Sequence, residues 1–122
     1  MHFTPHRLAL CVALASAALA ANATDYQVGN ASTSTLELKK GDTLKVLPTG
    51  SIVSAADDGV ILPKQTSGTT VSVDNAGIIR STVARGIDTK DGGTDQSFFV
   101  ITNRAGALIQ GTNDGIRFQT NP

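Results

Sequence analysis

Apolar and polar residues alternate in short runs along most of this chain. The clearest runs place two apolar residues on either side of a single position, and they are Leu44 and Val46, Val71 and Val73, and Phe99 and Ile101. A period of two over such short runs is typical of β-strands, and no run is long enough to favour a helix. We therefore predict a chain of short strands, with no helix after residue 23.

A longer pattern occurs three times. The copies are TGSIVSAADDGVIL from Thr49, AGIIRSTVARGIDT from Ala76 and AGALIQGTNDGIRF from Ala105, offset by 27 and then 29 residues. Each copy carries two glycines nine residues apart, and these pairs are Gly50 and Gly59, Gly77 and Gly86, and Gly106 and Gly115. Self-similarity at a spacing of about 20–50 residues indicates stacked structural repeats.

Each repeat is expected to supply three strands, which form three columns when the repeats stack. The inward residues expected in the second column are Ile52, Ile79 and Leu108. Those expected in the third column are Val60 with Leu62, Ile87 with Thr89, and Ile116 with Phe118. One repeat cannot bury its apolar face alone, whereas repeats stacked about 4.8 Å apart pair every strand with its equivalents above and below.

This pattern predicts an all-β fold, a right-handed parallel β-helix with coils at 44–70, 71–98 and 99–122. Residues 24–43 are expected to form a partial first coil, with Tyr26 and Val28 in the second column and Leu36 and Leu38 in the third. An antiparallel sandwich is the alternative, since it also has short, evenly spaced strands. It does not require equivalent side chains to recur every 27 to 29 residues, so the β-helix is favoured.

The paired glycines are expected at corners, where glycine readily adopts the left-handed backbone conformation. Asn75 and Asn103 precede the second and third copies, and their side-chain amides are expected to stack and to bond to each other. Pro48 falls near this position in the first copy, so the asparagine ladder should have two rungs.

The first 23 residues have the features of a signal peptide. Arg7 provides a positive charge, and the largely apolar run from Leu8 to Ala20 is too short to span a bilayer. Two A-x-A cleavage motifs follow, Ala18-Leu19-Ala20 and Ala21-Asn22-Ala23. We favour cleavage after Ala23 because polar sequence begins at Thr24, and an uncleaved anchor is the less favoured alternative.

Cleavage there would leave nine basic and ten acidic side chains, a net charge of −1. This balance argues against a nucleic-acid partner. Cleavage would also remove His2, His6 and Cys11, which are the only histidines and the only cysteine of the chain. Imidazole, thiolate and disulfide chemistry are therefore not expected in the mature protein.

Three stretches carry a resemblance to a known family: GDTLKVLPTGSIVSAADDGV from Gly41, VSVDNAGIIRSTVARGID from Val71 and FVITNRAGALIQGTNDGIRF from Phe99. They resemble the N-terminal passenger region of bacterial autotransporters, whose β-helical coils, of the pectin-lyase-like solenoid type, follow an export signal. The resemblance implies export through the inner membrane and display at the cell surface or release, commonly for adhesion. The 122 residues do not include the barrel of eight or more strands that such proteins use as a translocator.

We therefore expect a non-enzymatic fragment of a passenger, with no catalytic, cofactor-binding or metal-binding residues. Expected partners are cell-surface or matrix ligands, of protein or glycan, and a second copy bound at the open C-terminal strand edge. No direct membrane span is expected in the mature chain. If the chain ends at residue 122, its expected location is the periplasm. The alternative function is a truncated polysaccharide-active enzyme with the same fold, similar to pectin lyases and hydrolases.

That alternative depends on Asp57 and Asp58, because paired carboxylates can protonate a leaving oxygen and activate water. Adjacent residues of a strand point to opposite faces, and the equivalent positions in the other copies are Ala84 with Arg85, and Asn113 with Asp114. A polar corner is thus the favoured interpretation. Asp88 and Arg117 should form an exposed pair in one outward column, and such a pair contributes little to stability.

The remaining candidates have simpler explanations. Gly92, Gly93 and Asp95 are similar to part of a calcium-binding repeat, but that repeat needs tandem copies. The other candidates are an anion site at Lys64 and Lys90, glycosylation acceptors at Asn22 and Asn30, and an outward apolar patch of Val53, Ile61, Val100 and Ile109. Ordinary surface residues and chance motifs account for all of these.

Overall fold

The structure of the chain is a computed structural model that describes residues 23–63, 69–89 and 98–119. All the regular elements in these ranges are strands, as expected, and they form three parallel sheets. Sheet A contains β1 (Asp25–Val28), β4 (Thr43–Val46), β7 (Thr70–Asn75) and β10 (Phe98–Asn103). Sheet B contains β2 (Ala31–Ser32), β5 (Ser51–Ser54), β8 (Ile78–Ser81) and β11 (Leu108–Gln110). Sheet C contains β3 (Leu36–Glu37), β6 (Val60–Leu62), β9 (Ile87–Thr89) and β12 (Ile116–Arg117).

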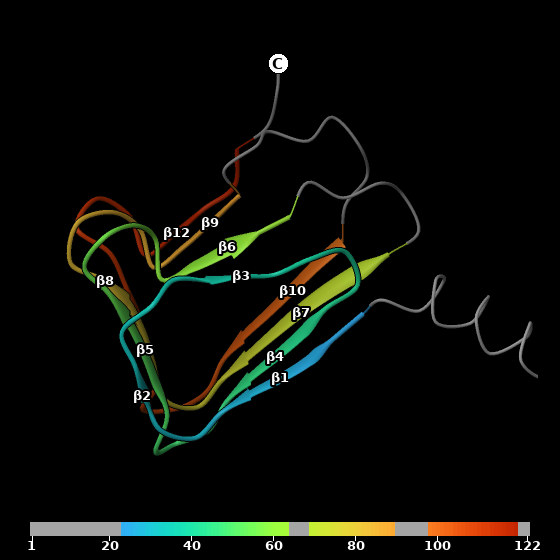
Figure 1. Cartoon of the computed structure of the whole chain (residues 1–122), viewed down its shortest axis with the longest axis horizontal. Coiled ribbons are helices and arrows are strands. Elements are labelled where there is room, and N and C mark those ends of the chain that lie inside the picture. Colours follow the sequence, from blue (N-terminus) through green and yellow to red (C-terminus); the bar gives the residue numbers. More distant parts are fainter. Residues whose placement is uncertain (1–22, 64–68, 90–97, 120–122) are drawn as a thin grey trace, which may run out of the picture.

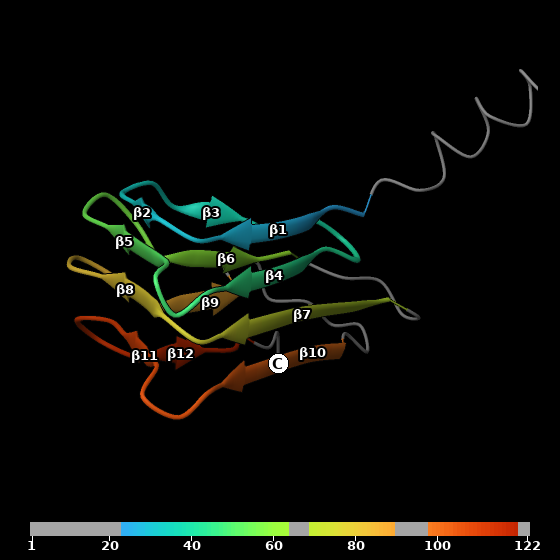
Figure 2. The same cartoon turned by 90° about the horizontal axis from the view of Figure 1, so that it is seen from below.

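Each strand pairs in parallel with the strand three places later in the chain, never with the next one. Successive strands lie in different sheets, which form the three sides of a triangle when viewed along the stack (Figure 1). We call β1–β3 coil 1, β4–β6 coil 2, β7–β9 coil 3 and β10–β12 coil 4, and Figure 2 shows these coils lying one above another. This arrangement is that of a parallel β-helix, and it excludes the antiparallel sandwich for the described residues.

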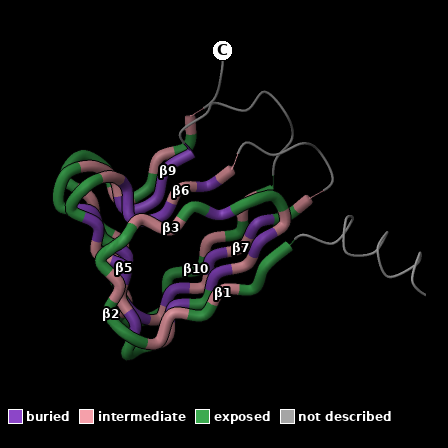
Figure 3. Tube along the Cα trace, viewed as in Figure 1, coloured by how far each residue is buried: buried purple, intermediate pink, exposed green. Residues whose placement is uncertain are grey.

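The core lies between the three sheets. Its ten buried apolar residues are Leu38, Leu44, Val46, Ile52, Val60, Leu62, Val71, Val73, Ile79 and Ile87. Equivalent residues stack directly, with Ile52 over Ile79 in sheet B and Val60 over Ile87 in sheet C. Each such side chain contributes about 1.5–3 kcal/mol by leaving water. Figure 3 shows the buried positions concentrated in coils 2 and 3, between two more exposed end coils.

Coil 1 differs from the expectation in one column. Tyr26 and Val28 pair with Leu44 and Val46 in sheet A, so their predicted place in the second column is wrong. The second column of this coil is the two-residue strand β2, whose small polar residues carry no apolar alternation that a sequence pattern could reveal. The predicted third column is confirmed, because Leu36 pairs with Val60.

Coil 4 also corrects the predicted register. Ile79 pairs with Ile109, and Leu108 pairs with the exposed Ile78, so Leu108 points outward and Ile109 packs against the core. The turn from Asn103 to Leu108 contains two more residues than its equivalent in coil 3, which shifts the strand. The prediction that Leu108 is inward and Ile109 outward is therefore wrong.

The two-rung asparagine ladder is confirmed. The Asn75 side-chain amide donates to Oδ1 of Asn103 at 2.8 Å and to the carbonyl of Leu108 at 3.0 Å. Its own Oδ1 accepts from the N–H of Gly77 at 3.1 Å, so this fully buried side chain is satisfied on both sides. Val46, rather than Pro48, lies opposite Asn75 in coil 2.

The corner between sheets B and C holds Gly59, Gly86 and Gly115 in coils 2, 3 and 4. The N–H of Val60 donates to the carbonyl of Gly86 at 2.9 Å, and the N–H of Ile87 donates to that of Gly115 at 2.9 Å. The second glycine of each repeat therefore stacks as predicted. The first glycine aligns only between Gly50 and Gly77, because Ala107 rather than Gly106 lies next to Leu108 in the register.

The physical role of these corner glycines differs from the prediction. Among the described residues only Gly41 and Gly106 have positive φ, at 79° and 80°. A Cβ atom on Gly86 would lie 2.6 Å from the carbonyl oxygen of Gly115 and 2.9 Å from Cγ2 of Ile109. The corner glycine is required because neighbouring coils approach closely, and a left-handed backbone is not the reason.

Candidate functional site

A column of charged residues lies at the corner between sheets B and C. Asp58, Arg85 and Asp114 each precede a corner glycine, and the N–H of Gly59 donates to the carbonyl of Arg85 at 2.9 Å. The buried Asp58 carboxylate accepts the N–H of Arg85 at 2.9 Å, and Nε of Arg85 donates to Asp114 at 3.2 Å. The column alternates in charge from coil to coil, so its members neutralise one another.

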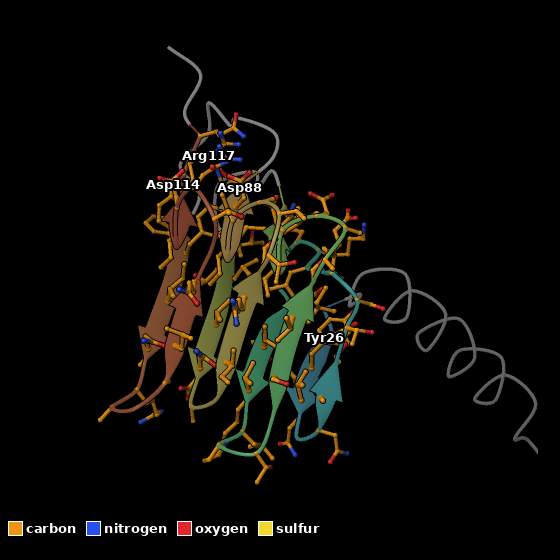
Figure 4. The ribbon with its side chains drawn as sticks, turned by 90° about the vertical axis from the view of Figure 1, so that its left-hand side faces the viewer. Tyr26, Asp88, Asp114 and Arg117 are labelled. Atoms are coloured by element: carbon orange, nitrogen blue, oxygen red, sulfur yellow. The ribbon has the colours of Figure 1, made fainter. Side chains whose placement is uncertain are left out.

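A second charged pair lies beside this column. Nε and Nη2 of Arg117 donate to the two oxygens of Asp88 at 2.9 and 2.7 Å. The pairing in one column is as predicted, but Asp88 is only 1% exposed, so the prediction of a solvent-exposed pair is wrong. Figure 4 shows Asp88, Asp114 and Arg117 gathered in one region, away from Tyr26 in coil 1.

The electrostatics of this region are dominated by hydrogen bonding. The Asp88 carboxylate, through its hydrogen bonds, raises the pKa of Arg117 above its usual value, and the negative charges of Asp58 and Asp114 add to this effect. Three carboxylates and two guanidinium groups therefore hold one another in fixed positions. Such a network binds adjacent coils together and leaves its charged groups engaged within the protein.

The paired acids of the enzyme alternative lie in this corner. Oδ1 of Asp57 accepts the N–H of Asp58 at 2.9 Å, while Asp58 accepts the N–H of Arg85 from the next coil. This use of both carboxylates in main-chain hydrogen bonds favours the polar-corner interpretation. Within the described ranges, no group of three His, Cys, Asp or Glu side chains is placed to hold a metal ion.

Sequence reasoning missed a pair of buried serines at the end of sheet B. Oγ of Ser81 donates to the carbonyl of Asp57 at 2.6 Å and accepts the N–H of Ala84 at 2.8 Å. Ser54 holds the equivalent position in coil 2 and accepts the N–H of Asp57 at 3.2 Å. Their signal was available, because both serines occur two residues after an inward isoleucine at the repeat offset of 27.

Several predicted candidates lie outside the described residues, namely Lys64, Lys90, Gly92, Gly93, Asp95 and Asn22. Asn30 is exposed immediately before β2, and its carbonyl accepts the N–H of Ser51 at 3.2 Å. The proposed outward patch does not form as predicted. Val53, Ile61 and Val100 belong to three different sheets, and Ile109 points inward.

Exposed apolar side chains instead gather on coil 4. Five of its residues are between 40% and 55% exposed, namely Phe98, Val100, Leu108, Ile116 and Phe118. The rings of Phe99 and Phe118 stack with centroids 5.8 Å apart, which brings apolar surface of sheets A and C together. β10, β11 and β12 are the last strands of their sheets, so one main-chain edge of each lacks a strand partner among the described residues. We call this surface the coil 4 face, and it is the strongest candidate for a binding site.

Comparison of the chain with protein families, curated proteins and solved structures found no match in any of the three. In the part of the chain that the structure describes, no helix is long and apolar enough to cross a membrane.

Proposed function

We propose that this protein is an exported, non-enzymatic, right-handed parallel β-helix that acts as a contact surface. It would be the N-terminal portion of an autotransporter-like passenger, displayed at the cell surface or released, and would bind other cells, matrix or its own copies. The signal-like segment of residues 1–23 supports export. The stacked parallel sheets support a repetitive, elongated surface, which is how solenoid proteins bind large partners.

The exposure of the coil 4 face is the observation that carries this proposal. Ile87 of coil 3 is completely buried, whereas its equivalent in coil 4, Ile116, is 40% exposed. An exposed apolar strand edge is a template for pairing with a further strand. The face therefore has both the apolar surface and the main-chain groups needed to receive another coil.

A second copy of this chain is the occupant that the register favours. Coil 1 presents half-buried apolar residues, Tyr26, Val28 and Leu36, and its strands run in the same direction as those of coil 4. If coil 1 of one copy stacked on coil 4 of another in the observed register, Glu37 would face Arg117 in the outward column of sheet C. Opposite charges at this position would favour head-to-tail assembly.

Light scattering on residues 24–122 tests this association. We expect oligomers that grow with protein concentration, and we expect Val100→Lys to shift the population toward monomer, because lysine on an edge strand opposes pairing. Val83→Lys is the matched control, since both valines are 52% exposed but Val83 lies in the turn after β8. A clean monomer in the unsubstituted protein, or equal effects of the two lysines, would contradict the proposal.

Cell fractionation and a binding assay test the wider function. The full chain expressed in a bacterium should be found outside the cytoplasm without residues 1–23. The purified mature protein, coated on beads, should retain cells or matrix proteins more strongly than beads coated with the Val100→Lys variant. Cytoplasmic retention of the full chain would rule out the exported role.

A further inference from the structure

Asp42 is a buried carboxylate that the proposed function does not use. It lies immediately before β4 and is 1% exposed. Burying a carboxylate is costly unless its oxygens are hydrogen-bonded and its charge is balanced. The four ion-paired carboxylates among the described residues are other side chains, namely Glu37, Asp74, Asp88 and Asp114.

The two oxygens of Asp42 have different partners. Oδ2 accepts the N–H of Lys39 at 2.7 Å, and the N–H of Asp42 donates back to the carbonyl of Lys39 at 3.1 Å. These two bonds close the turn between β3 and β4. Oδ1 accepts the N–H of Thr24, 18 residues earlier in the chain, also at 2.7 Å. One oxygen therefore serves the local turn, and the other holds the start of β1.

Thr24 is fixed on both sides of its main chain. Its nitrogen is held by Asp42, and its carbonyl accepts the N–H of Thr43 at 3.0 Å. Thr24 is also the residue that follows the favoured cleavage motif Ala21-Asn22-Ala23. Hydrolysis of the Ala23–Thr24 peptide bond adds one water, leaving a carboxylate on Ala23 and an amine on Thr24. An α-amino group has a pKa of about 7.7–8, so near neutral pH it takes up a proton.

We propose that Asp42 is the binding site for the new amino terminus that removal of the signal peptide creates. This inference rests on cleavage after Ala23, which is part of the proposed function. The nitrogen that donates one proton to Oδ1 before cleavage becomes a charged ammonium group after it, without having to move. A charge-assisted bond to a buried carboxylate is stronger than a neutral one. Processing therefore fixes β1, and with it coil 1, on the rest of the β-helix.

Three versions of the protein separate this charge from the hydrogen bond itself. The first begins at Thr24 with a free amine. The second begins at Thr24 with an acetylated amine, which keeps the N–H donor and removes the charge. The third begins at Ala23, which displaces the charge by one residue. At about pH 6.5 we expect the free-amine protein to unfold at a temperature roughly 4–8 °C higher than the other two.

Asp42→Asn in the free-amine and acetylated proteins completes the test, because it removes the negative charge at the same place. The two variant proteins should then unfold at the same temperature. If the acetylated and free-amine proteins with Asp42 unfold alike, or if the advantage survives Asp42→Asn, the proposed site is wrong.

The pH dependence gives an independent measurement. The amine should have a raised pKa in the folded state, so its stabilisation is complete below about pH 8, the unfolded value, and is lost as pH rises through the folded value. The neighbouring titratable groups are Asp25, Tyr26, Glu37 and Lys39. Tyrosine and lysine titrate near pH 10, and carboxylates near pH 4, so melting between about pH 7 and 9.5 isolates the amine. A free-amine advantage that is constant over this range would contradict the site.

N-terminal sequencing of the exported protein tests the cleavage separately. We expect the first residue to be Thr24. A different first residue, such as Ala21, would overturn the biological role of the site and would leave export itself supported.

Discussion

At the scale of single residues, buried polar side chains fix the turns of this β-helix. Asn75, Ser81 and Asp42 are each at most 2% exposed, and each accepts a main-chain N–H from a turn. Among the described residues, every buried side-chain nitrogen and oxygen has a hydrogen-bond partner. Because an unpaired buried polar group costs about 1–3 kcal/mol, each of these side chains makes one turn geometry much more stable than its alternatives.

The asparagine ladder gives the first prediction. Asn75→Ala would leave the N–H of Gly77 and the carbonyl of Leu108 without their partner, so we expect it to lower the free energy of unfolding by at least about 2 kcal/mol. Asn103→Ala is the control and should cost less than about 1 kcal/mol, because Asn103 is exposed and water can replace it. Urea denaturation measures both values. Equal losses would argue against the ladder.

The second prediction concerns the exposed pair of Asp74 and Arg104. Two hydrogen bonds from the guanidinium, at 2.7 and 2.8 Å, lower the pKa of Asp74 below its usual value. The stability from this pair is therefore present above the unfolded pKa, about 3.9, and is lost as pH falls through the folded pKa. The pair is solvent-exposed, so salt should weaken it further.

We expect Asp74→Asn to be slightly less stable than the unsubstituted protein at pH 7 and low salt, with the difference shrinking below about pH 4. Asp25→Asn is a suitable control, because Asp25 accepts a hydrogen bond from the Thr43 hydroxyl and has no guanidinium partner at this distance. Thermal melts from pH 2 to 7 provide the measurement. A difference that did not change with pH would show that the ion pair is not its source.

At the scale of elements, close approach between coils decides which corner residues are allowed. Gly86→Ala would place a methyl group against the main chain of coil 4, so we expect a loss of about 1–3 kcal/mol. Gly106→Asn should cost less, because a Cβ at Gly106 meets nothing within 4 Å and asparagine tolerates positive φ. Chemical denaturation of the two variants compares them directly. If Gly106→Asn were the more damaging change, backbone conformation would matter more than crowding.

The strand register of coil 4 gives a fourth prediction. Ile109 packs against the core and Leu108 is 40% exposed, so Ile109→Ala should destabilise the protein by about 1–2 kcal/mol more than Leu108→Ala. The two substitutions remove similar apolar volume from adjacent positions and so control for each other. The opposite order of stabilities would restore the register expected from the glycine spacing.

That register also shows how far the sequence could predict the elements. Coil 3 follows coil 2 at a constant offset of 27 through sheets B and C, and the columns of Ile52 with Ile79 and Val60 with Ile87 were predicted correctly. In coil 4 the first turn is two residues longer and the second is one residue shorter than in coil 3. The nine-residue glycine spacing survives these changes, while the strand between the turns slips by one residue.

A slip of one residue exchanges the two faces of a strand. Leu108 and Ile109 are both apolar, so alternation alone could not distinguish the inward one. The candidate site was harder to predict for a similar reason. The pairing of Asp88 with Arg117 followed from the repeat, but the burial of Asp88 depends on the surroundings of sheet C and has no signal in the repeat itself.

At the scale of the whole molecule, stability is expected to be shared between neighbouring coils, as in other solenoids. Coils 2 and 3 are covered on both sides and contain nine of the ten fully buried apolar residues, all except Leu38. Coils 1 and 4 each have one neighbour. Their exposed surfaces are the ones to which we assign function, the new amino terminus at Asp42 and the coil 4 face.

The central claim is that equivalent side chains of successive coils stack in parallel along one axis. Nuclear Overhauser contacts in the protein labelled at isoleucine test this most directly. The structure predicts contacts of Ile79 with both Ile52 and Ile109, and main-chain contacts of the parallel type between β5, β8 and β11. Contacts of the antiparallel type between strands adjacent in sequence, or contacts of Ile79 with Leu108 in place of Ile109, would contradict it.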